Sequence, residues 1–119
     1  LPYLYSVTDH LAALNRAETV PHDVAVPGHG PILSHVSAGV QANRALVEQV
    51  ASIVIELCAE PRMPEDLLAD LLVRLGGAPP DAASYYLLHP TIFAYLSHLE
   101  RIGAVAHHID RGRSLWSST

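Results

Sequence analysis

The chain has 119 residues, of which 50% are hydrophobic and 16% are charged, so it is expected to form one folded domain rather than a disordered chain. Its formal net charge is −5, it contains no lysine, and its seven cations are arginines, so we expect no nucleic-acid or anionic-membrane partner. A single cysteine, no basic leader region and no apolar run of about 18 residues together predict a cytoplasmic protein.

The first half of the chain alternates helical patterns with a short extended run. Apolar residues at helical spacing (Leu4, Val7, Leu11 and Leu14) predict a helix over residues 2–17, with Pro2 in its first turn. The β-branched run at 22–26 predicts a short strand that leads into a loop over 27–34. Ser34 is then expected to cap a long helix over 35–59.

Prolines and glycines divide the second half into short elements. The pattern predicts helices over 64–75, 81–88 and 90–102, followed by strands over 104–109 and 114–118. The sequence Asp-Arg-Gly-Arg between the two strands is typical of a hairpin turn. Three short helices followed by a two-stranded wing is the winged-helix arrangement, so the chain is predicted to be mainly α with a winged-helix-like second part.

One stretch near the start aligns with a metal-binding motif, but the two leading histidines of that motif are replaced by other residues. "YSVTDH" (5–10) aligns with H-x-H-x-D-H, but Tyr5 and Val7 stand at the two leading histidine positions and neither can replace an imidazole. The helical spacing through the same residues favours an ordinary helix, so Asp9 and His10 are not expected to bind metal.

The sequence "VPGHGP" (26–31) places His29 between two glycines and two prolines. Glycines let the backbone approach a metal closely, and prolines fix the loop. With the helix and strand before it and "LSHLERIGAV" (96–105) near the end, this motif resembles the C-terminal part of metallo-β-lactamase-fold hydrolases such as glyoxalase II and lactonases. The alternative is a Gly-Pro turn with an exposed histidine.

The resemblance implies a division of the chain and a role for one histidine. Residues 1–34 would be the C-terminal end of an α/β/β/α metallo-β-lactamase domain, and residues 35–119 a long helix plus a winged-helix-like accessory domain. His29 would bind one of two metals, expected to be zinc, in the intact parent. The chain starts at Leu1 rather than Met, and the family's other ligands lie upstream, so we expect a piece of a longer enzyme that is inactive and metal-free by itself.

The intact parent would then hydrolyse an ester, thioester or lactone through a metal-activated water, with the upstream catalytic domain as the partner of this chain. His22, His35 and the pair His107-His108 are not expected to be ligands. The apolar face of the first helix is expected to be buried against residues 35–59 or against a second copy in a homodimer.

The remaining features allow a function of another class. A self-standing winged-helix-like interaction module without catalytic activity is the alternative, but residues 60–119 carry seven acids and five arginines, which argues against DNA binding.

Tyr85, Tyr86 and Tyr95 are interpreted as core and rim aromatics rather than as a substrate pocket. Cys58 is expected to be a small buried hydrophobe.

Overall fold

The computed structural model describes residues 1–21, 24, 26, 27, 30, 31 and 34–119. Its helices and strands are α1 (Val7–Thr19), α2 (Val36–Leu57), α3 (Pro64–Arg74), α4 (Ala82–Arg101), β1 (Val105–Asp110) and β2 (Arg113–Ser118). The chain is therefore mainly helical, as predicted, and ends in a two-stranded antiparallel sheet. The predicted strand over 22–26 includes residues 22, 23 and 25, which lie outside the described residues, so it stays a prediction.

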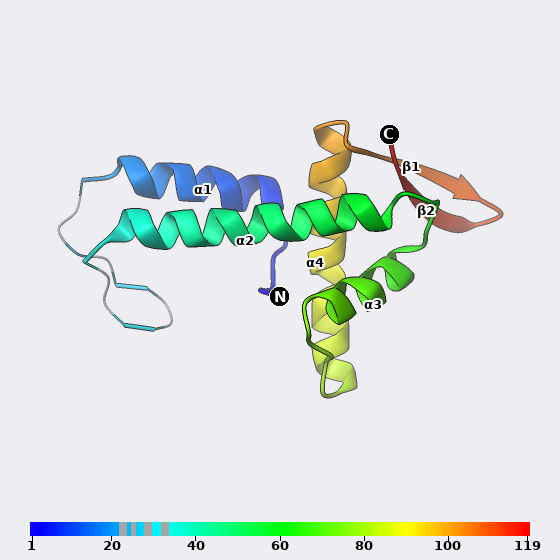
Figure 1. The fold of residues 1–119 in the computed structure, drawn as a ribbon, viewed down its shortest axis with the longest axis horizontal. Coiled ribbons are helices and arrows are strands. Elements are labelled where there is room, and N and C mark those ends of the chain that lie inside the picture. Colours follow the sequence, from blue (N-terminus) through cyan, green and yellow to red (C-terminus); the bar gives the residue numbers. More distant parts are fainter. Residues whose placement is uncertain (22–23, 25, 28–29, 32–33) are drawn as a thin grey trace.

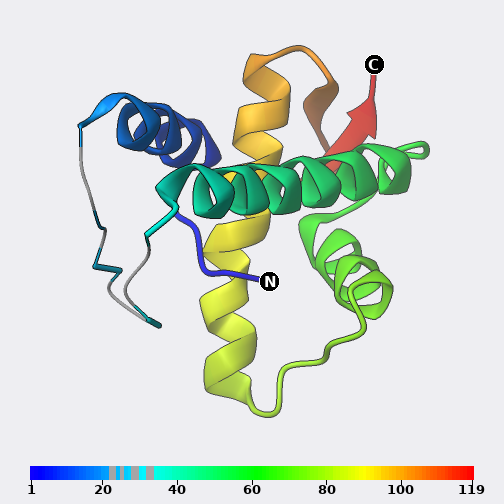
Figure 2. The same cartoon turned by 60° about the vertical axis from the view of Figure 1, so that its left-hand side comes forward.

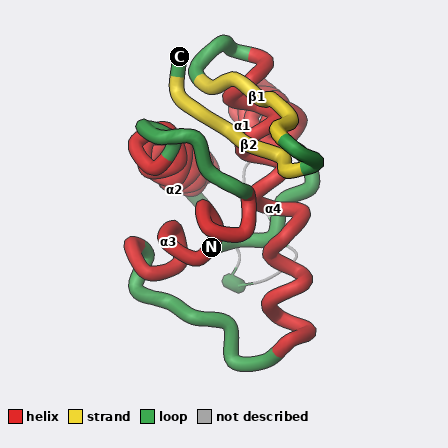
Figure 3. Tube along the Cα trace, turned by 90° about the vertical axis from the view of Figure 1, so that its right-hand side faces the viewer, coloured by secondary structure: helices red, strands yellow, loops and turns green. Residues whose placement is uncertain are grey.

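The helices α1 and α2 lie side by side and antiparallel, and α4 crosses α2 (Figure 1). Figure 2 shows α3 beside the lower part of α4, and Figure 3 shows the hairpin above α3, next to the end of α2. One core joins these elements, and its largest fully buried side chains are Tyr95, Leu67, Leu68, Leu71, Ile92, Leu96 and Leu99. In the part of the chain that the structure describes, no helix is long and apolar enough to cross a membrane.

The first helix begins later than predicted. Ser6 is the N-cap of α1, and its hydroxyl accepts a hydrogen bond of 3.1 Å from the backbone N–H of Asp9. Residues 1–5 instead lie outside the helix, and the N–H of Leu4 donates to Oγ1 of the buried Thr91 of α4 at 3.0 Å. The prediction of helix from Pro2 was wrong because this contact with α4 and the Ser6 cap hold the segment outside the helix.

The apolar face predicted from Leu4, Val7, Leu11 and Leu14 is buried only in part. Val7 is fully buried, whereas Leu11 and Leu14 of α1 and Leu4 before it are half-buried. Figure 1 shows α2 running along α1, and α2 is the helix that was expected to cover this face.

The long second helix begins at Val36 with His35 as its N-cap, and no side-chain hydrogen bond caps it. The prediction that Ser34 caps this helix was therefore wrong, and the helix also ends at Leu57 rather than at residue 59. The following helix agrees with its prediction more closely. Pro64 occupies its first turn, and Gly76 follows its end with a φ of 74°, a conformation that glycine adopts without strain.

The two helices predicted over 81–88 and 90–102 form one helix, α4, with Pro90 inside it. A proline in a helix removes the N–H that would bond to the carbonyl four residues earlier, here that of Tyr86. Tyr86 is 67% exposed, so this part of the helix lies at the surface. The core side chains on the opposite face hold the helix together on both sides of Pro90, so the predicted break does not occur.

The hairpin has the turn that its sequence predicts. Asp110 pairs with Arg113, so the two turn residues are Arg111 and Gly112, and both have positive φ values, 49° and 78°. This is the type I′ pattern, which matches the twist of the two strands. A bridge between Arg62 and Trp116 ties the segment after α2 to β2.

Candidate functional site

The predicted metal ligand His29 lies in the connection between α1 and α2. His29 and Gly28 are outside the described residues, as is His22, so the role of His29 in metal binding stays a prediction. The structure does describe the two helix ends that flank this connection. The carbonyl of Arg16 accepts hydrogen bonds from the Thr19 hydroxyl at 2.9 Å and from the Val20 N–H at 3.2 Å, which closes α1.

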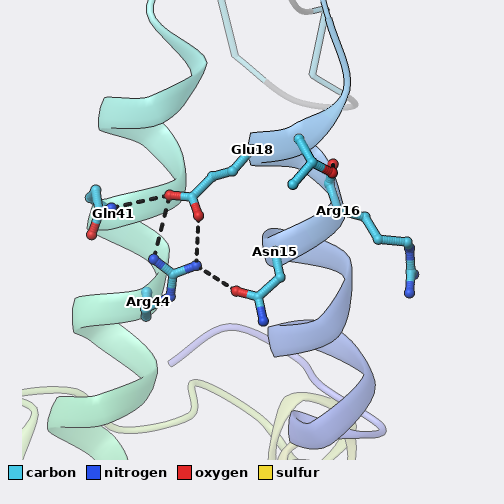
Figure 4. A network of polar contacts seen from close by, with 6 residues as sticks. Asn15, Arg16, Glu18, Gln41 and Arg44 are labelled. Carbon is cyan, nitrogen blue, oxygen red and sulfur yellow. Dashed lines mark hydrogen bonds and ion pairs between the residues drawn. The ribbon is translucent and has the colours of Figure 1, made fainter.

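A network of polar side chains joins the last turn of α1 to the second and third turns of α2 (Figure 4). Arg44 donates from Nη2 to the Asn15 amide oxygen at 2.7 Å and to Glu18 Oε2 at 3.2 Å, and from Nη1 to Glu18 Oε1 at 3.5 Å. Gln41 donates from Nε2 to Glu18 Oε1 at 3.1 Å. We call these four residues, Asn15, Glu18, Gln41 and Arg44, the Arg44 cluster.

The Arg44 cluster lies on the same part of α2 as the buried Val40, one to two turns before the core residues Val47, Val50 and Val54. The side chains of Arg44 and Glu18 are 23% and 29% exposed, so the ion pair is partly shielded from water. A planar guanidinium that binds both carboxylate oxygens holds a fixed geometry, which a single ammonium cannot do.

The start of α1 is tied to α4 by a second polar contact. Thr8 Oγ1 and His98 Nδ1 lie 2.8 Å apart in a partly buried position. Burial lowers the pKa of His98, because the charged imidazole is poorly solvated there, and the nearby positive charge of Arg101 lowers it further. His98 therefore favours the neutral form, which can share a hydrogen bond with Thr8 in either direction.

The lowered pKa of His98 predicts an acid-sensitive fold. The unfolded chain takes up a proton at His98 near pH 6.5 while the folded chain resists it, so this contribution to stability is present above pH 6.5 and lost as the pH falls further. We expect His98→Gln to flatten the fall in the free energy of unfolding between about pH 7 and pH 5, measured by urea titration. His108→Gln, on the exposed hairpin, is the control and should keep the wild-type slope; equal slopes for wild type and His98→Gln would contradict the prediction.

The described residues do not form a zinc site by themselves. Zinc needs three or four protein donors, and no group of three or more histidine, cysteine, aspartate or glutamate side chains within the described ranges could hold a metal ion. Asp9 and His10 lie in α1, as the helical interpretation of "YSVTDH" requires. His35 lies at the start of α2 and is exposed.

The two hairpin histidines are surface residues of β1. His107 stacks on Trp116 with ring centroids 4.5 Å apart, and its Nε2 lies 3.0 Å from the Ser114 hydroxyl. His108 is the next residue along the strand and is exposed. The side chains of successive strand residues point to opposite faces of the sheet, so His107 and His108 cannot both bind one metal ion.

The tyrosines occupy core and rim positions, as predicted. Tyr95 is fully buried and its hydroxyl has no hydrogen-bond partner, and burial raises the pKa of Tyr95 to about 12. Tyr85 is half-buried and Tyr86 exposed, and both contact the ring of His89. None of the three tyrosines lines the open cavity of about 340 Å³ between the N-terminal segment, the α3–α4 connection and α4, which is lined by Leu1, Tyr3, Leu72, Gly77, Ala78, Pro79, Pro80, Ser84 and Leu88.

Cys58, at the end of α2, is a free and fully buried cysteine, as predicted. Burial raises the pKa of its thiol, and the positive charge of Arg62 opposes this only in part. A thiol kept protonated in this way is a poor nucleophile, so Cys58 is a packing residue.

Comparison with known proteins relates the fold to a larger one. No family model and no curated protein sequence matches the chain. Among solved structures, a β-lactamase domain protein from Burkholderia ambifaria matches with a TM-score of 0.80 and 21% identity. The match covers 92% of this chain and 32% of that one, so this chain spans about a third of the length of its structural neighbour. The fold is therefore that of a part of a β-lactamase-like protein, consistent with the resemblance seen in the sequence.

Proposed function

We propose that this chain is the C-terminal part of a metal-dependent hydrolase with the metallo-β-lactamase fold, acting on an ester, thioester or lactone. The observation that carries the proposal is the combination of the motif Pro27-Gly28-His29-Gly30 with a fold that matches one third of a β-lactamase domain protein. Either feature alone would be weaker, because a Gly-Pro turn is common and a fold is compatible with many functions.

In this proposal the two parts of the chain have different roles. Residues 1–34 complete the upstream catalytic domain, and His29 supplies one ligand to a zinc pair whose other ligands come from upstream. Because the other ligands lie upstream in this proposal, the chain alone is expected to hold no zinc. When bound in the parent, zinc would supply an activated water.

Residues 35–119 form, in this proposal, a long helix and a winged-helix-like accessory domain that contacts the catalytic domain or a second subunit. The hairpin after α4 supports the wing, but two helices, α3 and α4, stand where three short ones were expected, because the helices predicted over 81–88 and 90–102 are joined. The acidic balance of residues 60–119 supports a protein contact rather than a nucleic-acid contact, because clustered cations are needed to bind phosphates.

Two observations test the proposal. The coding sequence upstream of Leu1 should encode a further domain that contains H-x-H-x-D-H, and the 119 residues alone should hydrolyse no ester or lactone with or without added zinc. A start codon directly before Leu1 would favour the self-standing interaction module. Zinc-dependent turnover by the isolated chain would contradict the proposal.

A further inference from the structure

We infer that the exposed face of α4 is a homodimer interface, on which α4 of a second copy of this chain packs antiparallel across a two-fold axis. We call this stripe of residues the outer face of α4, and its members are Ala83, Tyr86, Pro90, Phe93, Ser97 and Glu100. The inference does not depend on the hydrolase proposal, because it uses no metal, no substrate and no residue of the Pro-Gly-His-Gly motif.

The outer face has the residue spacing of a seam between paired helices. Its members follow one another in alternating steps of three and four residues, so they form one stripe along α4. Tyr86 is largely exposed and Phe93 is 43% exposed, whereas Leu88 and Tyr95 belong to the core. Figure 3 shows α2 and α3 on one side of α4, and in that view no described helix or strand covers the other side of its lower half. Two aromatic side chains are therefore presented to water on a rigid helix.

The charge of the outer face favours a second copy of this chain as the partner. No Asp, Glu, Lys or Arg occurs between Ala82 and Leu99, although the whole chain has a net charge of −5. Two copies of an acidic chain repel each other, so they approach most easily through a face that carries no charge over most of its length. A strongly charged partner would find no opposite charge along this part of the face.

The two ends of α4 favour the antiparallel arrangement. Asp81 caps the start of the helix, Arg101 is its last residue, and both are exposed. A two-fold axis between Pro90 and Phe93 brings Arg101 of each copy to the start of the other α4, near Asp81. Glu100 then lies at the first turn of the other helix, where the helix dipole favours a negative charge. Parallel pairing would instead place like charges together.

The same axis makes the outer face complementary to itself in side-chain size. Tyr86 of each copy lies opposite Ser97 of the other, and Phe93 lies opposite Pro90, so each large ring meets a smaller residue. In a parallel pair, tyrosine would meet tyrosine and phenylalanine would meet phenylalanine. A two-fold interface uses the same patch on both subunits, so this self-complementarity is what a homodimer requires.

The first experiment measures the association of the 119-residue chain by sedimentation equilibrium. Because a single helix pair makes a small interface, we expect a dimer with a dissociation constant in the micromolar range. Phe93→Asp places a charge in the interface twice and should weaken the dimer about a thousandfold, the square of the roughly thirtyfold loss at one central interface residue. Ile109→Asp is the matched control, because Ile109 is also exposed but lies on β1, and it should dimerise as the wild type does.

Far-UV circular dichroism checks that both variants are folded. A wild-type chain that stays monomeric at millimolar concentration would overturn the inference. So would a folded Phe93→Asp variant that dimerises as tightly as the Ile109→Asp variant.

A second experiment tests the direction of pairing without a change in charge. Tyr86→Cys and Ser97→Cys are made in separate chains, and disulfide formation is measured for each variant alone and for their mixture. In the antiparallel dimer the two copies of either position lie roughly 16 Å apart along the helix axis, so only the mixture should crosslink. Cys58 is buried and does not compete. Crosslinking of each variant with itself and none in excess in the mixture would indicate a parallel pair and overturn the inference.

The longer parent distinguishes a second copy from another domain of the same chain. In the parent, the mixture of the two cysteine variants should crosslink as it does in the 119-residue chain. If the parent stays monomeric and Phe93→Asp lowers its stability, another domain covers the outer face and the inference is wrong. None of these outcomes bears on the metal content of His29→Ala, so the hydrolase proposal stands or falls separately.

Discussion

In the parent enzyme that we propose, His29→Ala is expected to lose one of two zinc ions and most of the hydrolytic activity while keeping its fold. The reason is that a metal with three or four protein ligands loses a large share of its binding energy with each ligand removed. The alanine cannot replace the imidazole, whereas the core that holds α1, α2 and α4 together is unaffected by a change in the connecting segment. Metal content by elemental analysis, turnover and far-UV circular dichroism check the three parts of this result.

His35→Ala is the matched control for this experiment. His35 is six residues further along the same connection, is exposed, and makes no side-chain capping bond to α2. It should therefore keep its metal and its activity. If His29→Ala behaved like His35→Ala, the Pro-Gly-His-Gly sequence would be explained by turn chemistry alone and the hydrolase proposal would lose its main support.

Local chemistry predicted some elements of this fold well. The bounds of α3 follow from Pro64 at its start and Gly76 after its end, and the hairpin follows from a turn sequence with glycine at a positive φ. In each case the deciding residues lie within a few positions of the element that they define. Short-range signals of this kind can be read without knowledge of the rest of the fold.

Two of the errors occurred where distant residues help to decide the local structure. Pro90 predicts a helix boundary by local rules, but buried residues of α4 on both sides of it, from Leu88 to Leu99, pack in the core and override that signal. Pro2 is compatible with a first helical turn, but Leu4 is held against Thr91, which is 87 residues away in sequence. Neither contact has a signature in the sequence near the residue concerned.

The same limit explains what was missed at the candidate site. The resemblance pointed to His29, which is recognisable from its flanking glycines and prolines. The Arg44 cluster was not predicted, because Glu18 and Arg44 are 26 residues apart and each occupies an ordinary polar position on a helix. Only the antiparallel pairing of α1 and α2 brings them together, and no local pattern predicts the register of that pairing.

The largest effect on stability is expected from Leu96→Ala, in the second half of α4. Leu96 is 0% exposed, and removal of its side chain leaves a cavity in a core shared by α2, α3 and α4. Truncation of a buried leucine costs about 2–5 kcal/mol, a large part of the roughly 5–15 kcal/mol that stabilises a domain of this size. Urea unfolding followed by circular dichroism measures the loss as a lower midpoint at an unchanged slope.

Leu87→Ala on the same helix separates packing from helix propensity. Leu87 is 52% exposed, so its truncation makes the same change in intrinsic helix propensity but removes little buried surface. Its effect should stay within about 0.5 kcal/mol, as for most surface substitutions. Because Thr91 and His98 on α4 hold the start of α1, a loosened α4 should also free that end of α1, and Leu96→Ala should increase amide exchange there. Equal losses of stability in the two variants would show that α4 is not packed as the structure describes.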